Sequence, residues 1–106
     1  MPLTFAPKRN IAQGSPCELS VCSVTGELSP DATGTYFKTD DYAEHACYRR
    51  HDSAYYIWYN IYTSYWYISS EAGGGGQYSW FSEDMLSSGY TAQAEATGTA
   101  TVAKVK

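Results

Sequence analysis

One run of residues constrains the fold of this chain more than any other: residues 54–69 read AYYIWYNIYTSYWYIS. Aromatic and β-branched side chains lose rotamer freedom in a helix, whereas a pleated sheet accommodates them well. Asn60 and Ser64 mark a connection near the middle of the run. The run therefore predicts a β-hairpin, with one strand at residues 54–59 and the second at residues 65–69.

Both faces of this hairpin are aromatic, because successive side chains on a strand point to opposite faces. The predicted faces are Tyr55, Ile57 and Tyr59 against Tyr56 and Trp58 on the first strand, and Trp66 and Ile68 against Tyr65 and Tyr67 on the second. A half-solvated sheet has one polar face, so we expect this hairpin to be covered on both. The core covers one face, and a neighbouring subunit, a ligand or more of the same chain covers the other.

The hairpin and the strand after it supply two sets of candidate residues. The predicted core residues are Trp58, Trp66, Ile57, Ile68 and Trp80. The predicted contact residues, either at a protein interface or stacked on a sugar ring, are Tyr55, Tyr59, Tyr65 and Tyr67. The chain has 11 tyrosines, and we expect some of them at a surface, where a ring with a polar tip makes a good contact.

The rest of the chain shows short segments and no sustained helical period. Further strands are predicted at residues 18–24, 35–38, 46–50, 78–81, 90–95 and 97–105, with an acidic loop at Asp40, Asp41 and Glu44, and one helical turn or a long loop at residues 82–89. The class is all-β: a small antiparallel β-barrel or β-sandwich of about seven short strands.

The domain organisation follows from the proline distribution and the length. Residues 1–16 hold three of the four prolines and predict an extended N-terminal arm. Residues 17–106 are long enough for one domain, and we expect them to form a single β domain.

Charge and hydropathy argue against two classes of partner. The net charge is −4 and the pI is about 4.9, whereas a nucleic-acid-binding protein needs a basic patch. The pair Arg49–Arg50 is interpreted as solvated or ion-paired. No segment is apolar over the length needed to span a bilayer, and the N-terminus lacks the continuous apolar stretch of a secretory signal. We expect neither a nucleic-acid nor a membrane partner.

The sequence contains no convincing catalytic or metal-binding group. His45, Cys47 and His51 are the one metal-like set, but Arg49 lies between them and zinc would need a fourth ligand. A nucleophilic pair of Cys47 with either histidine lacks an orienting partner and an oxyanion motif. Acidic residues lie in predicted loops, where carboxylates are ordinarily solvated. We therefore expect a non-enzymatic protein without a metal or a cofactor.

The three cysteines, Cys17, Cys22 and Cys47, are an odd number. A disulfide framework requires an even number, so free buried thiols are the favoured interpretation. A bridge from Cys17 or Cys22 to Cys47 is the alternative.

Several short motifs between Gly26 and Val105 carry a resemblance to a known class of module. They are Gly34-Thr35-Tyr36, Tyr56-Ile57-Trp58, Trp66-Tyr67-Ile68-Ser69, Gly73–Gly76 followed by Tyr78 and Trp80, and Ala96-Thr97-Gly98-Thr99-Ala100. In these motifs the chain resembles small aromatic all-β modules of bacteriophage structural proteins, including virion fibre and capsid accessory proteins. In that class the module is often part of a longer chain.

The resemblance implies a structural component of a virion, assembled in the host cytoplasm. We expect a capsid decoration or an accessory or fibre-type component that docks on capsid or tail proteins through its arm and its aromatic surface, as a homo-oligomer. It implies no catalytic residue. The alternative is a carbohydrate-binding module that stacks exposed Tyr and Trp rings on a glycan.

Overall fold

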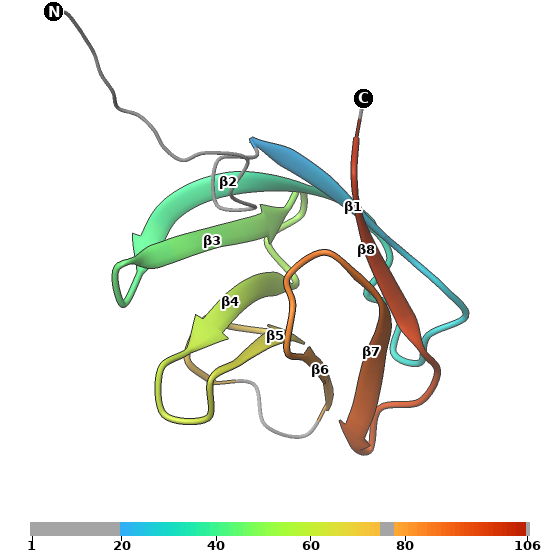
Figure 1. The fold of residues 1–106 in the computed structure, drawn as a ribbon. Coiled ribbons are helices and arrows are strands. Elements are labelled where there is room, and N and C mark those ends of the chain that lie inside the picture. Colours follow the sequence, from blue (N-terminus) through green and yellow to red (C-terminus); the bar gives the residue numbers. More distant parts are fainter. Residues whose placement is uncertain (1–19, 75–77, 106) are drawn as a thin grey trace, which may run out of the picture.

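Eight antiparallel strands follow one another around a closed barrel in the computed structural model, which describes residues 20–74 and 78–105 (Figure 1). The strands are β1 (Val21–Thr25), β2 (Gly34–Tyr42), β3 (His45–Arg50), β4 (Tyr56–Asn60), β5 (Tyr65–Ser69), β6 (Tyr78–Ser82), β7 (Ser87–Ala94) and β8 (Ala100–Lys104). The arm predicted at residues 1–16 lies outside the described residues. No helix in the described part of the chain has the length and apolarity needed to cross a membrane.

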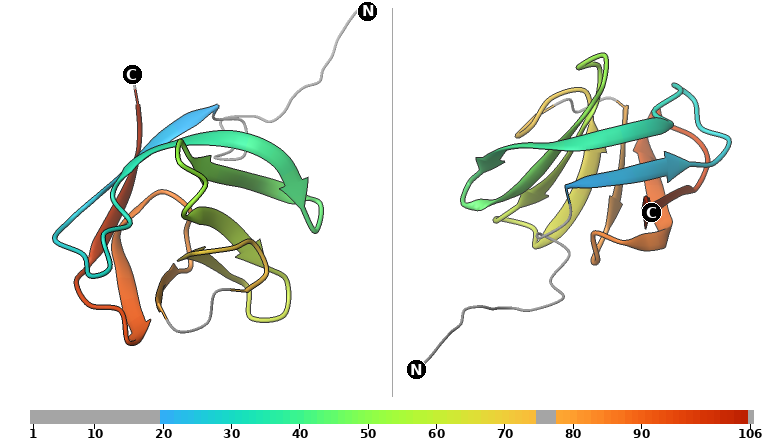
Figure 2. Two further views of the ribbon diagram at one scale, coloured as in Figure 1. Left: turned by 180° about the vertical axis from the view of Figure 1, so that it is seen from behind. Right: turned by 90° about the horizontal axis from the view of Figure 1, so that it is seen from above.

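Each strand pairs with the next along the chain, and the barrel closes where β8 returns to β1. In this closing pair Val24 lies opposite Val102 and Thr25 opposite Thr101. The three views in Figures 1 and 2 show β1 and β8 side by side. A closed barrel leaves no unpaired sheet edge, which a sandwich would leave. The all-β prediction is confirmed, and of its two alternatives the barrel is correct.

The strands predicted at residues 54–59 and 97–105 are shifted or shorter, because β4 spans Tyr56–Asn60 and β8 spans Ala100–Lys104. Two other predicted segments differ in kind from the structure. Asp40 and Asp41 do not form a loop: they lie in β2, which runs on to Tyr42. Their side chains are exposed there, so carboxylates are tolerated in a strand that extends past the core. The segment predicted as a helical turn or a long loop is a short connection, because β7 already begins at Ser87.

The barrel interior is filled by side chains. Every strand contributes one large, almost fully buried residue to the core cluster: Val24, Tyr36, Tyr48, Ile57, Ile68, Trp80, Tyr90 and Val102. An eight-stranded barrel has an interior just wide enough for side chains to fill. Three tyrosines and a tryptophan occupy much of it here. The interior is therefore a packed core.

Two buried tyrosines each donate a hydrogen bond to a loop at one end of the barrel. The Tyr36 hydroxyl donates to the carbonyl oxygen of Ala32, in the loop between β1 and β2, at 2.6 Å. The Tyr90 hydroxyl donates to the carbonyl oxygen of Met85, in the loop between β6 and β7, at 2.7 Å. Strands alternate in direction, so these loops lie at opposite ends. Burial raises the pKa of both phenols, so both stay protonated donors at neutral pH.

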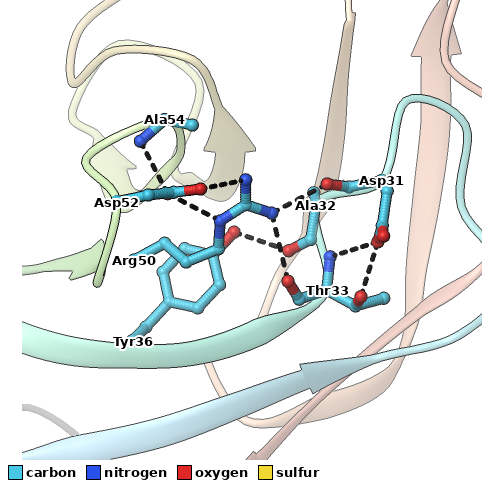
Figure 3. A network of polar contacts seen from close by, with 7 residues as sticks. All are labelled: Asp31, Ala32, Thr33, Tyr36, Arg50, Asp52 and Ala54. Atoms are coloured by element: carbon cyan, nitrogen blue, oxygen red, sulfur yellow. Dashed lines mark hydrogen bonds and ion pairs between the residues drawn. The ribbon is translucent and has the colours of Figure 1, made fainter.

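Arg50 joins two loops at one end of the barrel (Figure 3). Its Nε and Nη2 donate to the two carboxylate oxygens of Asp52 at 2.9 and 2.8 Å. Its Nη1 donates to the carbonyl oxygens of Asp31 and Thr33 at 2.7 and 3.1 Å. The hydrogen bond between the two side chains raises the pKa of Arg50 and lowers the pKa of Asp52. The guanidinium group thus links the β1–β2 and β3–β4 loops. Arg50 is ion-paired and Arg49 is exposed, which agrees with the prediction of a solvated or ion-paired site.

Candidate functional site

A layer of aromatic rings covers the outer face of β4, β5 and β6. This outer aromatic layer consists of Tyr42, Trp58, Tyr65, Tyr67 and Phe81. Trp58 and Tyr67 are cross-strand partners with ring centroids 5.2 Å apart and nearly parallel planes, and Tyr67 in turn lies opposite Phe81. Each such pair contributes about 0.5–1.5 kcal/mol beyond its buried area. The layer forms because these residues alternate with the core residues of the same strands.

Trp58 is buried on this outer face, with only 5% of its surface exposed. Its indole Nε1 donates to the Ser69 hydroxyl at 2.8 Å. The single proton of that hydroxyl can go to the carbonyl oxygen of Glu71 at 2.9 Å or of Gly74 at 2.7 Å. The start of the loop after β5 is therefore fastened over the outer face of β4, and the buried indole N–H has a partner.

Gly73 lets this loop meet the hairpin between β2 and β3. Its φ of +83° is in the region that favours glycine, and a Cβ built there would lie 2.3 Å from the Tyr42 hydroxyl oxygen. Tyr42 packs edge-on against Trp58, with ring centroids 5.6 Å apart. The glycine thus allows the loop, Tyr42 and Trp58 to converge.

The convergence leaves a pocket of about 180 Å³, here called the hairpin pocket. Its lining residues come from the β2–β3 turn, from β4 with its following turn, and from the loop after β5: Tyr42, Ala43, Trp58, Asn60, Ile61, Tyr62 and Gly73. Figures 1 and 2 show the β2–β3 and β4–β5 turns on the same side of the barrel. The residues at its rim are unusually exposed for apolar side chains: Tyr42 at 36%, Ile61 at 50% and Tyr62 at 90%.

Asn60 supplies a side-chain amide to the lining of the hairpin pocket. Its Oδ1 accepts hydrogen bonds from the backbone N–H groups of Tyr62 at 2.8 Å and Thr63 at 3.3 Å. Its backbone carbonyl accepts from the N–H of Ser64 at 2.8 Å. These bonds shape the β4–β5 turn and fix the orientation of the amide. The side-chain NH₂ is then the group left to donate to a ligand.

The four predicted contact tyrosines do not share one surface. Tyr55 packs against the core with its ring under Arg50, 4.9 Å from the guanidinium carbon. Tyr59 contacts Trp66, with ring centroids 5.2 Å apart. Tyr65 and Tyr67 lie in the outer aromatic layer. All four are half-buried.

Tyr42 and Tyr62, the two most exposed tyrosines for which burial is described near the hairpin pocket, are absent from the predicted set. In the sequence Tyr42 lies beside a predicted acidic loop and Tyr62 in the predicted hairpin connection, and the alternation of a strand singles out neither position. The position of Tyr62 between Asn60 and Ser64 was the available signal.

The predicted core residues divide between the core and the outer layer. Ile57, Ile68 and Trp80 are fully buried in the core cluster, and Trp66 is half-buried and packs against it. Trp58 is buried but belongs to the outer aromatic layer. Its strand position, next to Ile57, sends its side chain to the opposite face, so burial alone does not place a residue in the core.

The groups with potential chemistry are dispersed. Cys22 faces the core, whereas Cys47 is buried outside the core cluster, and both thiols are free, as predicted for them; Cys17 lies outside the described residues. Burial raises the pKa of Cys22 from 9.0 to about 12 and that of Cys47 to about 11, so neither is a thiolate at neutral pH. The ring of His45 packs against the ring of Tyr59, with ring centroids 4.4 Å apart. Among the described residues, no three His, Cys, Asp or Glu side chains are grouped to hold a metal ion.

No protein-family model matches the chain, and no curated protein or solved structure is detectably similar to it. The outer aromatic layer and the hairpin pocket are therefore interpreted from their own geometry.

Proposed function

We propose that this chain is a non-enzymatic structural protein of a bacteriophage virion: a capsid decoration or an accessory or fibre-type component. It is assembled into the particle in the host cytoplasm and docks on capsid or tail proteins. The observation that supports docking is the exposed apolar rim of Tyr42, Ile61 and Tyr62 at the edge of the outer aromatic layer. The virion itself is inferred from the sequence motifs.

The closed barrel restricts how such docking can occur. Its strands are paired on both sides, so a partner cannot add a strand to a free edge. The core is filled, so a partner cannot insert a segment into the interior. Side chains of the outer surface and of the turns remain, and exposed tyrosine is a residue type that dominates protein interfaces. The predicted arm would add a second attachment, and several copies would dock together as a homo-oligomer.

Mass spectrometry of purified virions tests the proposal. We expect the chain in particles purified through two density gradients, at a constant ratio to the major capsid protein. Recombinant chain added to particles that lack it should cosediment with them. The Tyr62→Ala variant should cosediment less than the wild type, whereas Phe37→Ala, an exposed aromatic on β2, serves as the matched control. A chain found only in the lysate of infected cells would contradict the proposal.

The oligomeric state has its own measurement. Light scattering over a range of protein concentrations should show an oligomer if surplus aromatic surface is a subunit interface. A monomer at every concentration would contradict the homo-oligomer and leave that surface to other partners.

A second candidate function is carbohydrate binding, on the same particle or elsewhere. The hairpin pocket favours it, because aromatic rings at its rim and the Asn60 amide combine apolar and polar contacts in one hollow. A glycan array probed with the intact chain tests it. Binding to a defined set of glycans would support this function, and an array without any hit would exclude the sugars it displays.

A further inference from the structure

We propose that the hairpin pocket binds one neutral pyranose ring of a glycan. This inference rests on the second candidate function, carbohydrate binding, and assigns it a site and a ligand class. The site differs from the tyrosines predicted from the sequence, because Tyr55, Tyr59, Tyr65 and Tyr67 do not line the pocket.

The size of the pocket suits a single ring. A volume of about 180 Å³ is available in it. The pocket is therefore smaller than a drug-sized site of about 300–1,000 Å³. One sugar unit is of this scale, whereas a folded peptide segment is larger. The remaining units of a glycan would extend into solvent past the exposed rim.

The rim supplies apolar contacts for the C–H face of a sugar. Tyr42 at the end of β2 and Tyr62 in the β4–β5 turn are exposed, and the buried Trp58 also lines the pocket. Tyr42 is held in place by its edge-on contact with Trp58 and by the backbone of Gly73. A ring that is already fixed loses little conformational entropy when a ligand stacks on it.

Asn60 supplies directional hydrogen bonding. Two backbone N–H groups of its own turn occupy Oδ1, so the amide cannot rotate freely and its NH₂ group remains a donor. A sugar hydroxyl is a good acceptor for that donor. A ligand with only an apolar ring, such as a proline or phenylalanine side chain, would leave the amide donor unpaired.

The charge of the site selects a neutral ligand. None of the lining residues is Asp, Glu, Lys, Arg or His. The turns that carry the lining residues contain Glu44 and Glu71, and the chain has a net charge of −4. A phosphate or an acidic sugar would therefore meet repulsion and no cationic partner. Neutral hexoses and N-acetylhexosamines fit these constraints.

The test is a titration of ¹⁵N-labelled protein with neutral oligosaccharides, followed by two-dimensional NMR. The probes are trisaccharides of glucose, mannose, galactose and N-acetylglucosamine, each at up to tens of millimolar. We expect one of them to shift the indole N–H signal of Trp58, the side-chain NH₂ signals of Asn60 and the backbone signal of Gly73 together. A sialylated trisaccharide should bind more weakly than its neutral counterpart.

Two variants test the assignment without unfolding the chain. Asn60→Asp keeps an oxygen that accepts from Tyr62 and Thr63 but removes the NH₂ donor, and Tyr62→Ala removes a ring that is almost fully exposed. Each should weaken binding by roughly threefold to tenfold, the range of one hydrogen bond or contact. Phe37→Ala, with an exposed aromatic on β2, should leave the affinity unchanged.

The outcomes separate this inference from the function on which it rests. If a glycan binds the wild type and both variants equally, the chain binds carbohydrate at another site and the pocket assignment is wrong. If none of the probes shifts the pocket signals and the glycan array also has no hit, both the pocket assignment and the carbohydrate function fail. Pocket signals that shift with an aromatic or proline-rich peptide and with no sugar would overturn the ligand class.

Discussion

The hydroxyl groups of Tyr36 and Tyr90 offer a sharp test of how the ends of this barrel are held. Each is fully buried and donates one hydrogen bond to a loop carbonyl, that of Ala32 or that of Met85. Replacing either tyrosine by phenylalanine removes a single oxygen and leaves the ring in place. The packing of the core is thereby kept, and the lost free energy reports on the hydrogen bond.

The expected magnitude follows from the carbonyl left behind. Ala32 and Met85 are almost completely inaccessible to water, so neither carbonyl can exchange the lost phenol for solvent. A buried polar group without a partner costs about 1–3 kcal/mol. We therefore expect Tyr36→Phe and Tyr90→Phe each to lower the free energy of unfolding by about 1–3 kcal/mol. The two loops lie at opposite ends, so the double variant should show the sum within about 0.5 kcal/mol.

Urea unfolding followed by tryptophan fluorescence measures this change as a shift of the midpoint at constant slope. Tyr62→Phe is the matched control, because its ring is 90% exposed, and it should stay within about 0.5 kcal/mol of the wild type. Wild-type stability in both buried variants would refute the reasoning, since it would mean that water or another donor replaces each phenol. A cost in one variant only would restrict the argument to that end of the barrel.

Three further predictions concern stability. Arg50→Lys should lower the free energy of unfolding by about 1–3 kcal/mol in urea, because an ammonium group cannot replace the fork between two loops, whereas the exposed Arg49→Lys should be neutral. Gly98→Ala should cost more than about 2 kcal/mol by thermal unfolding, since φ is +94° and a Cβ would lie 2.2 Å from a backbone oxygen, whereas Gly89→Ala has ordinary contacts and should have little effect. Burial raises the pKa of the Cys22 thiol from 9.0 to about 12, so its contribution to the free energy of unfolding is complete below pH 9 and is lost as the pH rises toward 12. In Cys22→Ala the free energy of unfolding, measured in urea, should therefore depend less on pH in that interval than in the wild type. The same pH dependence in both proteins would contradict this.

The strand alternation in residues 54–69 could be deduced from the sequence, because a side-chain period of two is a local property of the backbone. Ile57 and Ile68 do lie together in the core, and Trp58 and Tyr67 do share the opposite face. The same alternation sends the Trp58 side chain to the face opposite Ile57. Which of the two faces is the core is decided by what packs over each of them, and for Trp58 the prediction was wrong.

The ends of the strands were harder to predict from the sequence. The carboxylates of Asp40 and Asp41 are typical of a loop, yet β2 continues through both of them to Tyr42. Asp40 and Asp41 lie at a register shift between the pairs Thr39–Cys47 and Tyr42–His45, and these pairs with β3 hold the exposed end on either side of it. Such pairing depends on the neighbouring strand, and local propensity is overridden by it.

The candidate site could not be assembled from sequence alone. The hairpin pocket brings together residues 42–43, 58, 60–62 and 73, and the missing side chain of Gly73 makes room for the Tyr42 hydroxyl beside it. No spacing in the sequence indicates that the loop after β5 folds back over β4. That arrangement depends on the Trp58–Ser69 hydrogen bond and on the packing of Tyr42, which are contacts between separate elements.

The sequence by itself determined the class of this protein, all-β with a two-faced aromatic hairpin, because β-branched and aromatic composition and a period of two act residue by residue. The tertiary structure decided that the strands close into a barrel, since the pairing of β1 with β8 joins the two ends of the described sheet and depends on the summed twist of every strand between them. It also decided which aromatic rings fill the interior and which form the outer layer and the rim of the hairpin pocket. Those roles follow from what packs over each ring, and distant parts of the chain provide that cover.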